Sequence, residues 1–384
     1  MNKEFNKLPL DGIIILDLTN VLSGPFATLI LKDLGAKVIK VEKPGGDDSR
    51  SFGPFLNNKS CYFISLNRGK KSISLNLKIK EDKLIFKKLL SITDVLIDNF
   101  RPGVLEKLGF SWNYLSKTYP KLIHSKISGF GETGPLKNSP AYDIIVQAMG
   151  GLMGITGDDK NFYRVGTSIG DIAASLFCVI GILSQLIRRN KTNKGSKLDL
   201  SMLDCQVSIL ENAITRFSTE KKNPTPLGND HPSITPFGCF KTKNTAIVIA
   251  IGNDKLFKKF CEIIGDKKIP FEKMFISNKN RNINKMQLRK RIEKQLMKKG
   301  SVYWLKTLNK NGIPCSKINK ISDVINNPQI INRGMIFNYS DKDIKNLKLS
   351  DTPFKFNFYK SHKKKEVAPE LNENKKEILK MLLD

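Results

Sequence analysis

The chain has 384 residues, more than one domain usually holds, so two domains are expected. Its 40% hydrophobic residues are enough for a sizeable core and exclude a disordered or fibrous protein. The formal net charge of +29 would suit a nucleic-acid-binding protein. The lysines are scattered, however, and no nucleic-acid recognition motif accompanies them. We therefore interpret the charge as a lysine-rich solvated surface that also attracts small anions.

The first 220 residues alternate between strand-like and helix-like patterns. Short apolar runs typical of buried parallel strands are separated by amphipathic stretches of about ten residues. This alternation predicts a parallel sheet with right-handed crossovers and with ligand chemistry at the carboxyl ends of the strands. The predicted strands are 13–18, 38–42, 72–77, 95–97, 122–128 and 197–200, and the predicted helices are 24–34, 82–90, 171–189 and one that starts at 203.

Residues 221–230 lose hydrophobic periodicity and are typical of an interdomain linker. A smaller α+β unit follows, with a strand at 246–251 and helices at 254–264, 285–297 and 301–310; a terminal helix is predicted at 373–383. We therefore expect an α/β fold. Its large Rossmann-like domain spans residues 1–222 and is completed by 328–384, and its small α+β domain spans 223–327.

The most apolar stretch runs from Ile172 to Ile187 and is shorter than a membrane span of ~20 residues. It therefore predicts a buried helix, and Met1–Glu4 lacks the apolar run of a signal peptide. We expect a soluble, cytoplasmic protein that binds no membrane. The six cysteines show no CxxC pair and the chain has three histidines, so no metal site and no tightly bound cofactor are expected.

A literal GxGxxG spans Gly129–Gly134 after a predicted strand. In a dinucleotide-binding fold this motif opens a helix whose N-terminus holds the pyrophosphate. Here Pro135 follows the last glycine and a helical pattern returns only near Tyr142, so the context of a dehydrogenase is missing. The glycines more simply allow a tight turn or a close approach of backbone to a ligand.

Asp171 stands where a glycine-containing loop, Gly166–Gly170, meets the long apolar helix. The simplest interpretation is a helix N-cap, a common role for Asp. The functional alternative is a nucleophile that the helix N-terminus keeps ionised, with neighbouring backbone N–H groups as an oxyanion hole. The position alone favours the N-cap.

Basic and amide side chains recur near the ends of the predicted strands. At one edge of a parallel sheet they would form a rim that binds phosphate groups, whereas singly each is a solvated surface group. The spacing does not decide between these alternatives. The side chains are Lys43, Arg50, Arg68, Lys70, Lys71, Lys78, Asn99, Arg101 and Lys107.

Several segments together make the chain resemble the family III coenzyme A transferases, the group that includes formyl-CoA transferase. The resemblance runs from Gly12 to the terminal helix, and its motifs are specific as a set. They are 16–18 with Gly24-Pro25, 35–42, 98–103, 128–131, 141–143, 166–171, 199–204, 312–315 and 327–329.

The resemblance implies that Asp171 is the catalytic nucleophile, which forms a mixed anhydride and then an aspartyl-CoA thioester. It also implies an interlocked homodimer, acyl-CoA and carboxylate substrates, and no nucleic-acid partner. By the same resemblance the CoA site is lined by Lys43, Leu75, Asn99, Phe100, Arg101, Lys107, Pro140, Ala141, Tyr142 and Asp143, with Lys241 and Lys243 as looser candidates.

Two departures from formyl-CoA transferase concern substrate choice: Leu22 replaces a glutamine, and the glycine-rich lid is absent. Residues 229–243 are similar to the branch that transfers CoA from succinyl-CoA to dicarboxylic acids. A 2-methylacyl-CoA racemase remains the alternative within the family. That chemistry needs a second acid–base group, and Tyr142 stands where family racemases carry histidine. Tyrosine, with an ordinary pKa near ~10, is a poor base at neutral pH.

Overall fold

The computed structural model describes residues 7–158, 160–358 and 366–383. The chain divides into two units, one formed by Met1–Met153, Arg164–Lys222 and Gln329–Asp384, the other by Gly154–Tyr163 and Asn223–Pro328. The second unit thus includes ten residues from the first half of the chain that carry no periodic signal in the sequence. Each unit has its own hydrophobic core.

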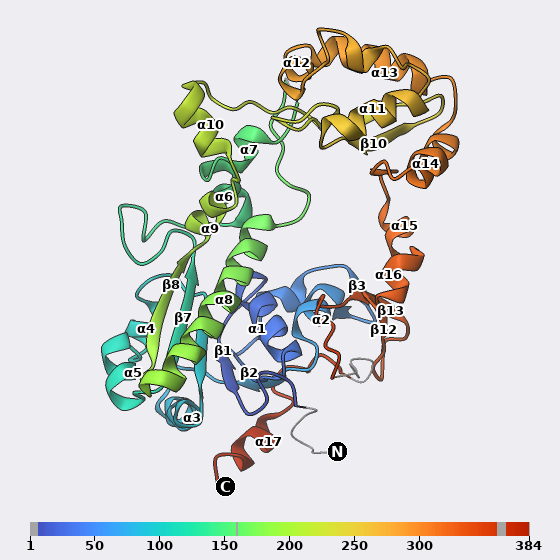
Figure 1. Cartoon of the computed structure of the whole chain (residues 1–384). Helices are drawn as coiled ribbons and strands as arrows, with labels where there is room; N and C mark the ends of the chain where they lie inside the picture. The colour runs from blue at the N-terminus through green and yellow to red at the C-terminus, as the bar shows by residue number, and fades with distance from the viewer. Residues whose placement is uncertain (1–6, 159, 359–365, 384) are drawn as a thin grey trace. The chain divides into compact units, whose positions relative to one another are not determined.

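The first unit is an α/β domain in which strands and helices alternate along the chain (Figure 1). Its regular elements are β1 (Ile14–Asp17), α1 (Ser23–Asp33), β2 (Lys37–Glu42), β3 (Phe55–Leu56), β4 (Lys59–Ser60), α2 (Cys61–Asn67), β5 (Lys71–Ser74), α3 (Lys80–Ser91), β6 (Val95–Asp98), α4 (Val104–Lys107), α5 (Trp112–Thr118), β7 (Ile123–Ser128), α6 (Asp143–Met149), α7 (Leu152–Ile155, which runs into the second unit), α8 (Ile169–Thr192), β8 (Ser196–Ser201), α9 (Met202–Ser208), α10 (Ala213–Glu220), α16 (Pro328–Asn332, which starts in the second unit), β12 (Ile336–Tyr339), β13 (Leu347–Ser350) and α17 (Lys375–Lys380).

Six of the described strands form a parallel sheet in the order β5-β2-β1-β6-β7-β8. From β1 the chain first moves outward to β2 and β5, and it then returns to the other side of β1 with β6. The strand order therefore reverses between β1 and β6. In open α/β sheets, the crevice outside the carboxyl ends of two such strands is the usual place for a ligand.

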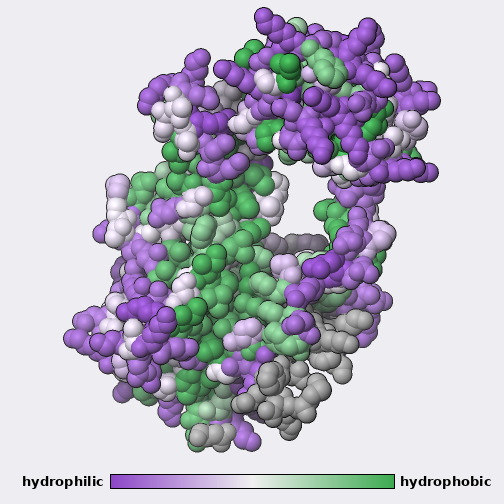
Figure 2. Space-filling view, in the orientation of Figure 1, coloured by the Kyte–Doolittle hydropathy of each residue, from purple (hydrophilic) through white to green (hydrophobic). Residues whose placement is uncertain are grey.

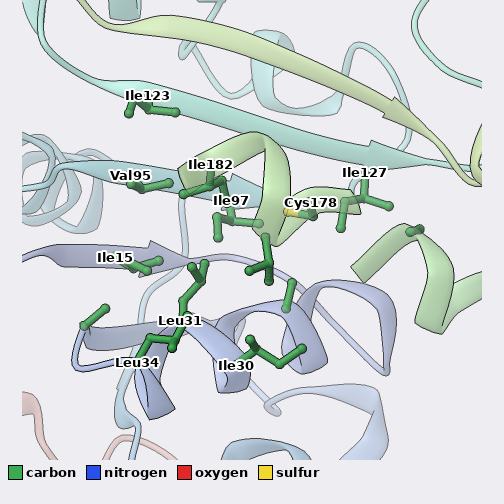
Figure 3. Close-up of a cluster of buried hydrophobic side chains, with 14 of the residues drawn as sticks. Ile15, Ile30, Leu31, Leu34, Val95, Ile97, Ile123, Ile127, Cys178 and Ile182 are labelled. Carbon is green, nitrogen blue, oxygen red and sulfur yellow. The ribbon is translucent and has the colours of Figure 1, made fainter. Parts of the chain in front are cut away.

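Both faces of this sheet are buried, which explains the nearly continuous apolar strands. In β6, Val95 and Ile97 point to a cluster that also contains α1 and α8, while Leu96 points to the opposite cluster with α3 and α5. Figure 3 shows the first of these clusters, with Cys178 and Ile182 of α8 against the strands.

Helix α8 is long and apolar enough to cross a membrane by length and composition alone. Its inner face carries Ala174, Cys178 and Ile182, which are fully buried in the core of the domain. The core helix of a folded domain passes the same test, so α8 fits the predicted buried helix.

The GxGxxG segment is a loop in the structure. Residues 129–142 contain turns and bends, and α6 begins only at Asp143. The glycines of this motif do not open a helix, which matches the expectation that they are not a dinucleotide-binding element.

The second unit is an α+β domain built on an antiparallel sheet in the order β11-β10-β9. Alternate residues of β10 enter its core, in which Ile247 and Ile249 pack against Phe257 and Phe260. Its elements are β9 (Phe237–Lys241), β10 (Ala246–Ala250), α11 (Asp254–Ile263), α12 (Asn278–Ile283), α13 (Lys285–Leu296), α14 (Ser301–Lys310), β11 (Cys315–Ser316) and α15 (Ile321–Ile325).

Candidate active site

A cavity of about 400 Å³ lies at the carboxyl ends of β1, β6 and β7, next to the point where the strand order reverses. The connections that follow these three strands supply most of its walls. It is lined by residues 20–23 after β1, Asp48, residues 99–102 after β6, residues 127–129, Lys137, residues 139–143, Asp171 and Met202. The cavity therefore brings together segments that are spread between residues 20 and 202 of the chain.

Asp171 lies in the first turn of α8 and lines the cavity with a half-buried side chain. The helix begins two residues earlier than its apolar pattern indicated, at Ile169, and its N-cap is Ser168. The N-cap interpretation of Asp171 is therefore wrong, because the carboxylate sits inside the helix and not at its cap. Its backbone carbonyl accepts a hydrogen bond of 2.7 Å from Ser175 Oγ, which also donates to the Ser23 carbonyl at 2.6 Å.

The electrostatic environment of Asp171 opposes ionisation. Burial raises the pKa of Asp171, the negative charge of Asp143 raises it as well, and a hydrogen bond from Ser23 partly offsets both effects, so that the pKa lies at about 7. The sequence predicts that the helix N-terminus keeps this carboxylate ionised, but the cost of desolvation outweighs the field of the helix. At neutral pH the side chain exists in both protonation states, which is common for groups with a catalytic role.

Asp143 anchors the loop before α8 to α6. Its carboxylate accepts hydrogen bonds from the Gly170 backbone N–H at 2.8 Å and from Gln147 Nε2 at 2.7 Å. Gly170 is needed at this contact, since a Cβ there would lie 3.0 Å from Asp143 Oδ1 and 2.7 Å from Val146. The Gly170 N–H is thus already occupied, so it does not supply the oxyanion hole that the sequence suggested.

Asn99 holds the β1 connection with both ends of its amide. Its Oδ1 accepts from the Asn20 N–H and its Nδ2 donates to the Asn20 carbonyl, each at 2.9 Å. The preceding residue, Asp98, is itself fixed, because it accepts from His124 Nε2 at 2.7 Å and from the Phe100 N–H at 3.1 Å. Asn99 therefore acts as a rigid tie between two walls of the cavity.

Eight of the eleven site residues predicted from the sequence line this cavity. Besides Asp171, Asp143 and Asn99, they are Phe100, Arg101, Pro140, Ala141 and Tyr142. Arg101 and Tyr142 are exposed, Tyr142 by 78%, so both can reach a ligand that enters from solvent.

The other three predicted residues do not line the cavity. Leu75 is 3% exposed and packs in a hydrophobic cluster of the sheet. Lys43 is exposed and pairs with Asp48 at 2.6 Å, and Asp48 is itself a wall of the cavity. Lys107 is an exposed residue at the end of α4. Lys43 and Lys107 thus have exposed side chains that are not part of the cavity wall, while Leu75 has no exposed side chain for a ligand.

The predicted phosphate-binding rim is wrong for several of its basic residues. Arg68 is fully buried and forms two hydrogen bonds with Asp33, at 2.8 and 2.9 Å. Lys70 is also buried and lies 3.2 Å from Asp17. Burying a charge is tolerated only when it is paired, so these two residues support the domain internally. Arg50 likewise pairs with Glu42.

Sequence reasoning missed the walls supplied by Val21, Ser23, Asp48, Ser128 and Met202. Part of the signal was present in the sequence: Val21, Asp48 and Met202 follow predicted strands, Ser128 ends one, and Ser23 directly precedes a predicted helix, and cavity walls are expected at such positions. Their residue types carry no catalytic signature, and only the fold brings them beside Asp171.

Comparisons with known proteins identify the family. A model of CoA-transferase family III matches residues 10–375. This chain belongs to CoA-transferase family III. It is therefore an enzyme that transfers coenzyme A, and its substrates are CoA thioesters.

Individual relatives agree with the family across almost the full chain. The chain is 41% identical to acetyl-CoA:oxalate CoA-transferase of Acetobacter aceti over 96% of this chain and 94% of that protein. It is 36% identical to succinyl-CoA:glutarate CoA-transferase of Mus musculus, over 98% of this chain and 86% of that protein. The crystal structure of a CAIB/BAIF family protein from Brucella suis superimposes with a TM-score of 0.86 at 34% identity, covering 98% of this chain and all of that one.

Proposed function

We propose that this CoA-transferase moves coenzyme A from an acyl-CoA to a dicarboxylic acid through covalent intermediates on Asp171. The Asp171 carboxylate attacks the thioester carbonyl carbon, the C–S bond breaks, and CoA leaves as a thiolate. The thiolate then attacks the Asp171 carbonyl carbon of the mixed anhydride, which releases the donor acid and leaves an aspartyl-CoA thioester.

The second half of the exchange repeats these steps in reverse order. The acceptor carboxylate attacks the aspartyl thioester carbonyl and expels the thiolate, which forms a second anhydride. The thiolate attacks the acceptor's carbonyl carbon in that anhydride, so the new acyl-CoA leaves and the Asp171 carboxylate is restored. The cycle is balanced in protons, and each step exchanges one acyl leaving group for another.

One observation carries the proposal: Asp171 is a half-buried carboxylate, exposed to the cavity, whose pKa burial raises to about 7. A carboxylate with a higher pKa is a stronger nucleophile than an ordinary one, and a fraction of it is ionised at neutral pH. The position at a cavity wall gives a thioester access to it.

The substrates are proposed from chemistry and relatives together. The proteins named above act on oxalate and glutarate, both dicarboxylic acids, with acetyl-CoA or succinyl-CoA as donor. We propose succinyl-CoA as the first donor to test. Arg101, an exposed residue of the cavity wall, would supply positive charge for the phosphates of CoA, together with the exposed Lys43 and Lys107.

We also propose a cytoplasmic homodimer. Leu176, Ile180 and Ile187 on the outer face of α8 are 47%, 57% and 61% exposed, and their spacing of four and seven places them on one side of the helix. In Figure 2 hydrophobic surface gathers over α8. An exposed apolar stripe of this kind fits an interface between two copies, and light scattering that gave a monomeric mass would refute it.

The central test is exchange between succinyl-CoA and glutarate or oxalate, measured with Asp171→Ala and with Asp11→Ala, an exposed carboxylate outside the cavity, as the matched control. Loss of exchange in the first variant and not in the second supports the proposal. Hydroxylamine added with succinyl-CoA should trap Asp171 as a hydroxamate by mass spectrometry. A modified protein whose label lies on another residue would contradict the route.

A further inference from the structure

The connection between β1 and α1 contains strained backbone at the cavity wall. Val21 has a φ of +67°, the left-handed region, which β-branched residues adopt very rarely. The next residue, Leu22, has φ −132° and ψ −61°, also outside the common regions. Such backbone persists only when the surrounding structure imposes it, and it concentrates at functional sites.

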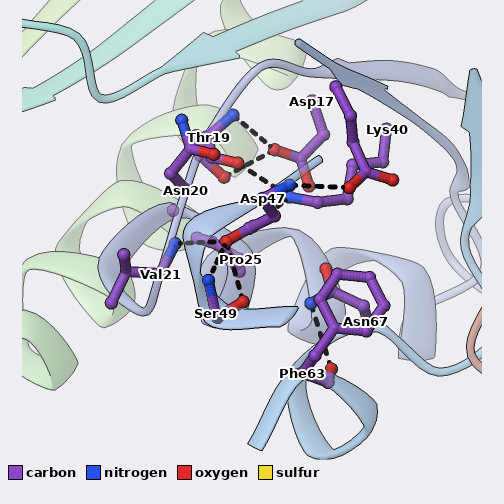
Figure 4. A network of polar contacts seen from close by, with 12 residues as sticks. Asp17, Thr19, Asn20, Val21, Pro25, Lys40, Asp47, Ser49, Phe63 and Asn67 are labelled. Carbon is purple, nitrogen blue, oxygen red and sulfur yellow. Dashed lines mark hydrogen bonds and ion pairs between the residues drawn. The ribbon is translucent and has the colours of Figure 1, made fainter. Parts of the chain in front are cut away.

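Thr19 and Asn20, the two residues before Val21, are held by side chains from β1, from β2 and from the residue that follows β6. The Lys40 ammonium donates to the Thr19 carbonyl at 2.7 Å, and the Asp17 carboxylate accepts from the Thr19 N–H at 2.9 Å. Asn20 is held by both ends of the Asn99 amide. The backbone on the N-terminal side of Val21 is therefore clamped residue by residue (Figure 4).

Asp47 completes the clamp at Val21 itself. Its Oδ1 accepts from the Val21 N–H at 3.2 Å and from the Ser49 N–H at 2.8 Å, and its Oδ2 forms an ion pair with Lys40 at 2.8 Å. Both charged side chains are fully buried. A buried ion pair adds little net stability, since desolvation offsets the attraction, so stability alone does not explain it.

The C-terminal side of the strained turn leads directly to Asp171. The Ser23 carbonyl accepts from the Ser175 hydroxyl of α8, which also lies 2.7 Å from the Asp171 carbonyl, and the Ser23 side chain lowers the pKa of Asp171. Leu22 and Ser23 both line the cavity. A change of backbone conformation at Val21 is therefore passed within two residues to Ser23, whose carbonyl is linked through Ser175 to the turn of α8 that carries Asp171.

We propose that Val21 is a positioning residue whose left-handed backbone, imposed by the buried Lys40–Asp47 pair, holds Ser23 against the turn of α8 that carries the Asp171 carboxylate. The proposal rests on Asp171 as the nucleophile and adds a device that sets its orientation and charge state. Strain at Val21 lowers stability, and the fold retains it because the cavity wall needs this one shape.

Substitution by glycine separates positioning from stability. Val21→Gly relieves the strain and frees the turn, because glycine adopts positive φ without penalty. Val21→Asn relieves part of the strain but favours the same left-handed shape. Lys221→Gly is the matched control: Lys221 also has a positive φ, +53°, but it ends α10 and does not line the cavity.

Thermal unfolding, kcat, KM and the pH dependence of kcat/KM are measured on the full-length variants. Val21→Gly should unfold at the same or a higher temperature than wild type. Its kcat should fall about tenfold, while its KM for succinyl-CoA stays within about threefold. The half-maximal pH of kcat/KM should rise in Val21→Gly, and it should also rise in Ser23→Ala. Val21→Asn should keep kcat within about threefold of wild type, and Lys221→Gly should leave both kcat and pH profile unchanged.

Wild-type kcat and an unshifted pH profile in Val21→Gly would overturn the positioning role, as would an equal loss in Lys221→Gly. If Val21→Gly does not fold, the pH profile of Ser23→Ala decides, and an unshifted profile overturns it. Failure of the proposed function looks different: the wild type would lack exchange activity, or Asp171→Ala would retain it.

Discussion

Asp171→Asn should make the folded protein more stable at neutral and alkaline pH. Burial and the charge of Asp143 raise the pKa of the wild-type carboxylate from 3.8 to about 7, although a hydrogen bond from Ser23 lowers it slightly. The native state therefore holds this proton more tightly than the unfolded chain does. Stability falls as pH rises from about 4 to about 7 and then levels off. Asparagine has no such proton and escapes the loss.

The magnitude follows from the pKa difference. A rise from 3.8 to about 7 corresponds to about 4 kcal/mol of lost unfolding free energy once the carboxylate is ionised in both states. Asp171 is partly exposed, so water screens part of this cost. We expect the variant to gain about 2 kcal/mol over wild type between pH 5 and pH 8.

Urea unfolding at pH 5, 6, 7 and 8 measures this gain. The chain has two tryptophans, Trp112 in the first unit and Trp304 in the second, so a Trp304→Phe background reports the unit that contains Asp171. The control is Asp341→Asn in the same unit. Burial raises the pKa of Asp341, but hydrogen bonds from the Ile344 and Asp343 N–H groups outweigh it and lower the pKa.

The control variant should be less stable than wild type by a constant amount from pH 5 to pH 8, since the lowered pKa of Asp341 adds stability that is lost only in more acidic solution. The Asp171→Asn difference should instead grow with pH. A difference between Asp171→Asn and wild type that stays flat over this range would refute the claim that Asp171 is hard to ionise in the fold.

Three further predictions concern activity. Exchange should increase with pH and reach half its maximum near pH 7, because burial raises the pKa of Asp171 to about 7; a flat profile from pH 5 to pH 8 would contradict this. Asp143→Asn removes a negative charge beside Asp171 and should lower the pH at which exchange reaches half its maximum, while the new amide oxygen still accepts from the Gly170 N–H. An unchanged half-maximal pH would show that the Asp143 charge does not act on Asp171. Gly129→Ala should lower kcat/KM by about tenfold with unchanged circular dichroism, since the new Cβ would lie 2.2 Å from the Ala141 Cβ at the cavity wall, whereas Gly252→Ala meets no atom within 4 Å and should be neutral.

The order and type of the main elements could be predicted from the sequence because parallel strands buried on both faces leave short, almost uninterrupted apolar runs. The run expected at 95–97 is β6, Val95–Asp98, and the run at 122–128 is β7, Ile123–Ser128. The pairs β3–β4 and β12–β13 were missed. Their strands are two to four residues long and mix exposed, half-buried and buried positions, so they are too short to show a clear burial pattern.

The candidate nucleophile was also within reach of the sequence, because Asp171 stands in a recognisable loop before a long apolar helix. The sequence did not, however, predict the charge state of this carboxylate. The raised pKa depends on Asp143, 28 residues earlier in the chain, and on burial that exists only when α8 packs into the domain. Lys70 and Arg68 show the same limit, since their residue type predicts solvent exposure and the fold pairs them internally.

By itself the sequence determined the strands of the parallel sheet and the long helix α8, since burial on both faces of such a sheet requires short apolar runs that are visible in the sequence. It also placed Asp171 at the start of α8. Only the tertiary structure decided that Asp171 is hard to ionise, that Val21 is held in a left-handed turn, and that Lys40 and Asp47 are the groups holding it. These properties arise from fields and contacts between residues far apart in the chain, and neither field nor contact exists until the sheet has assembled.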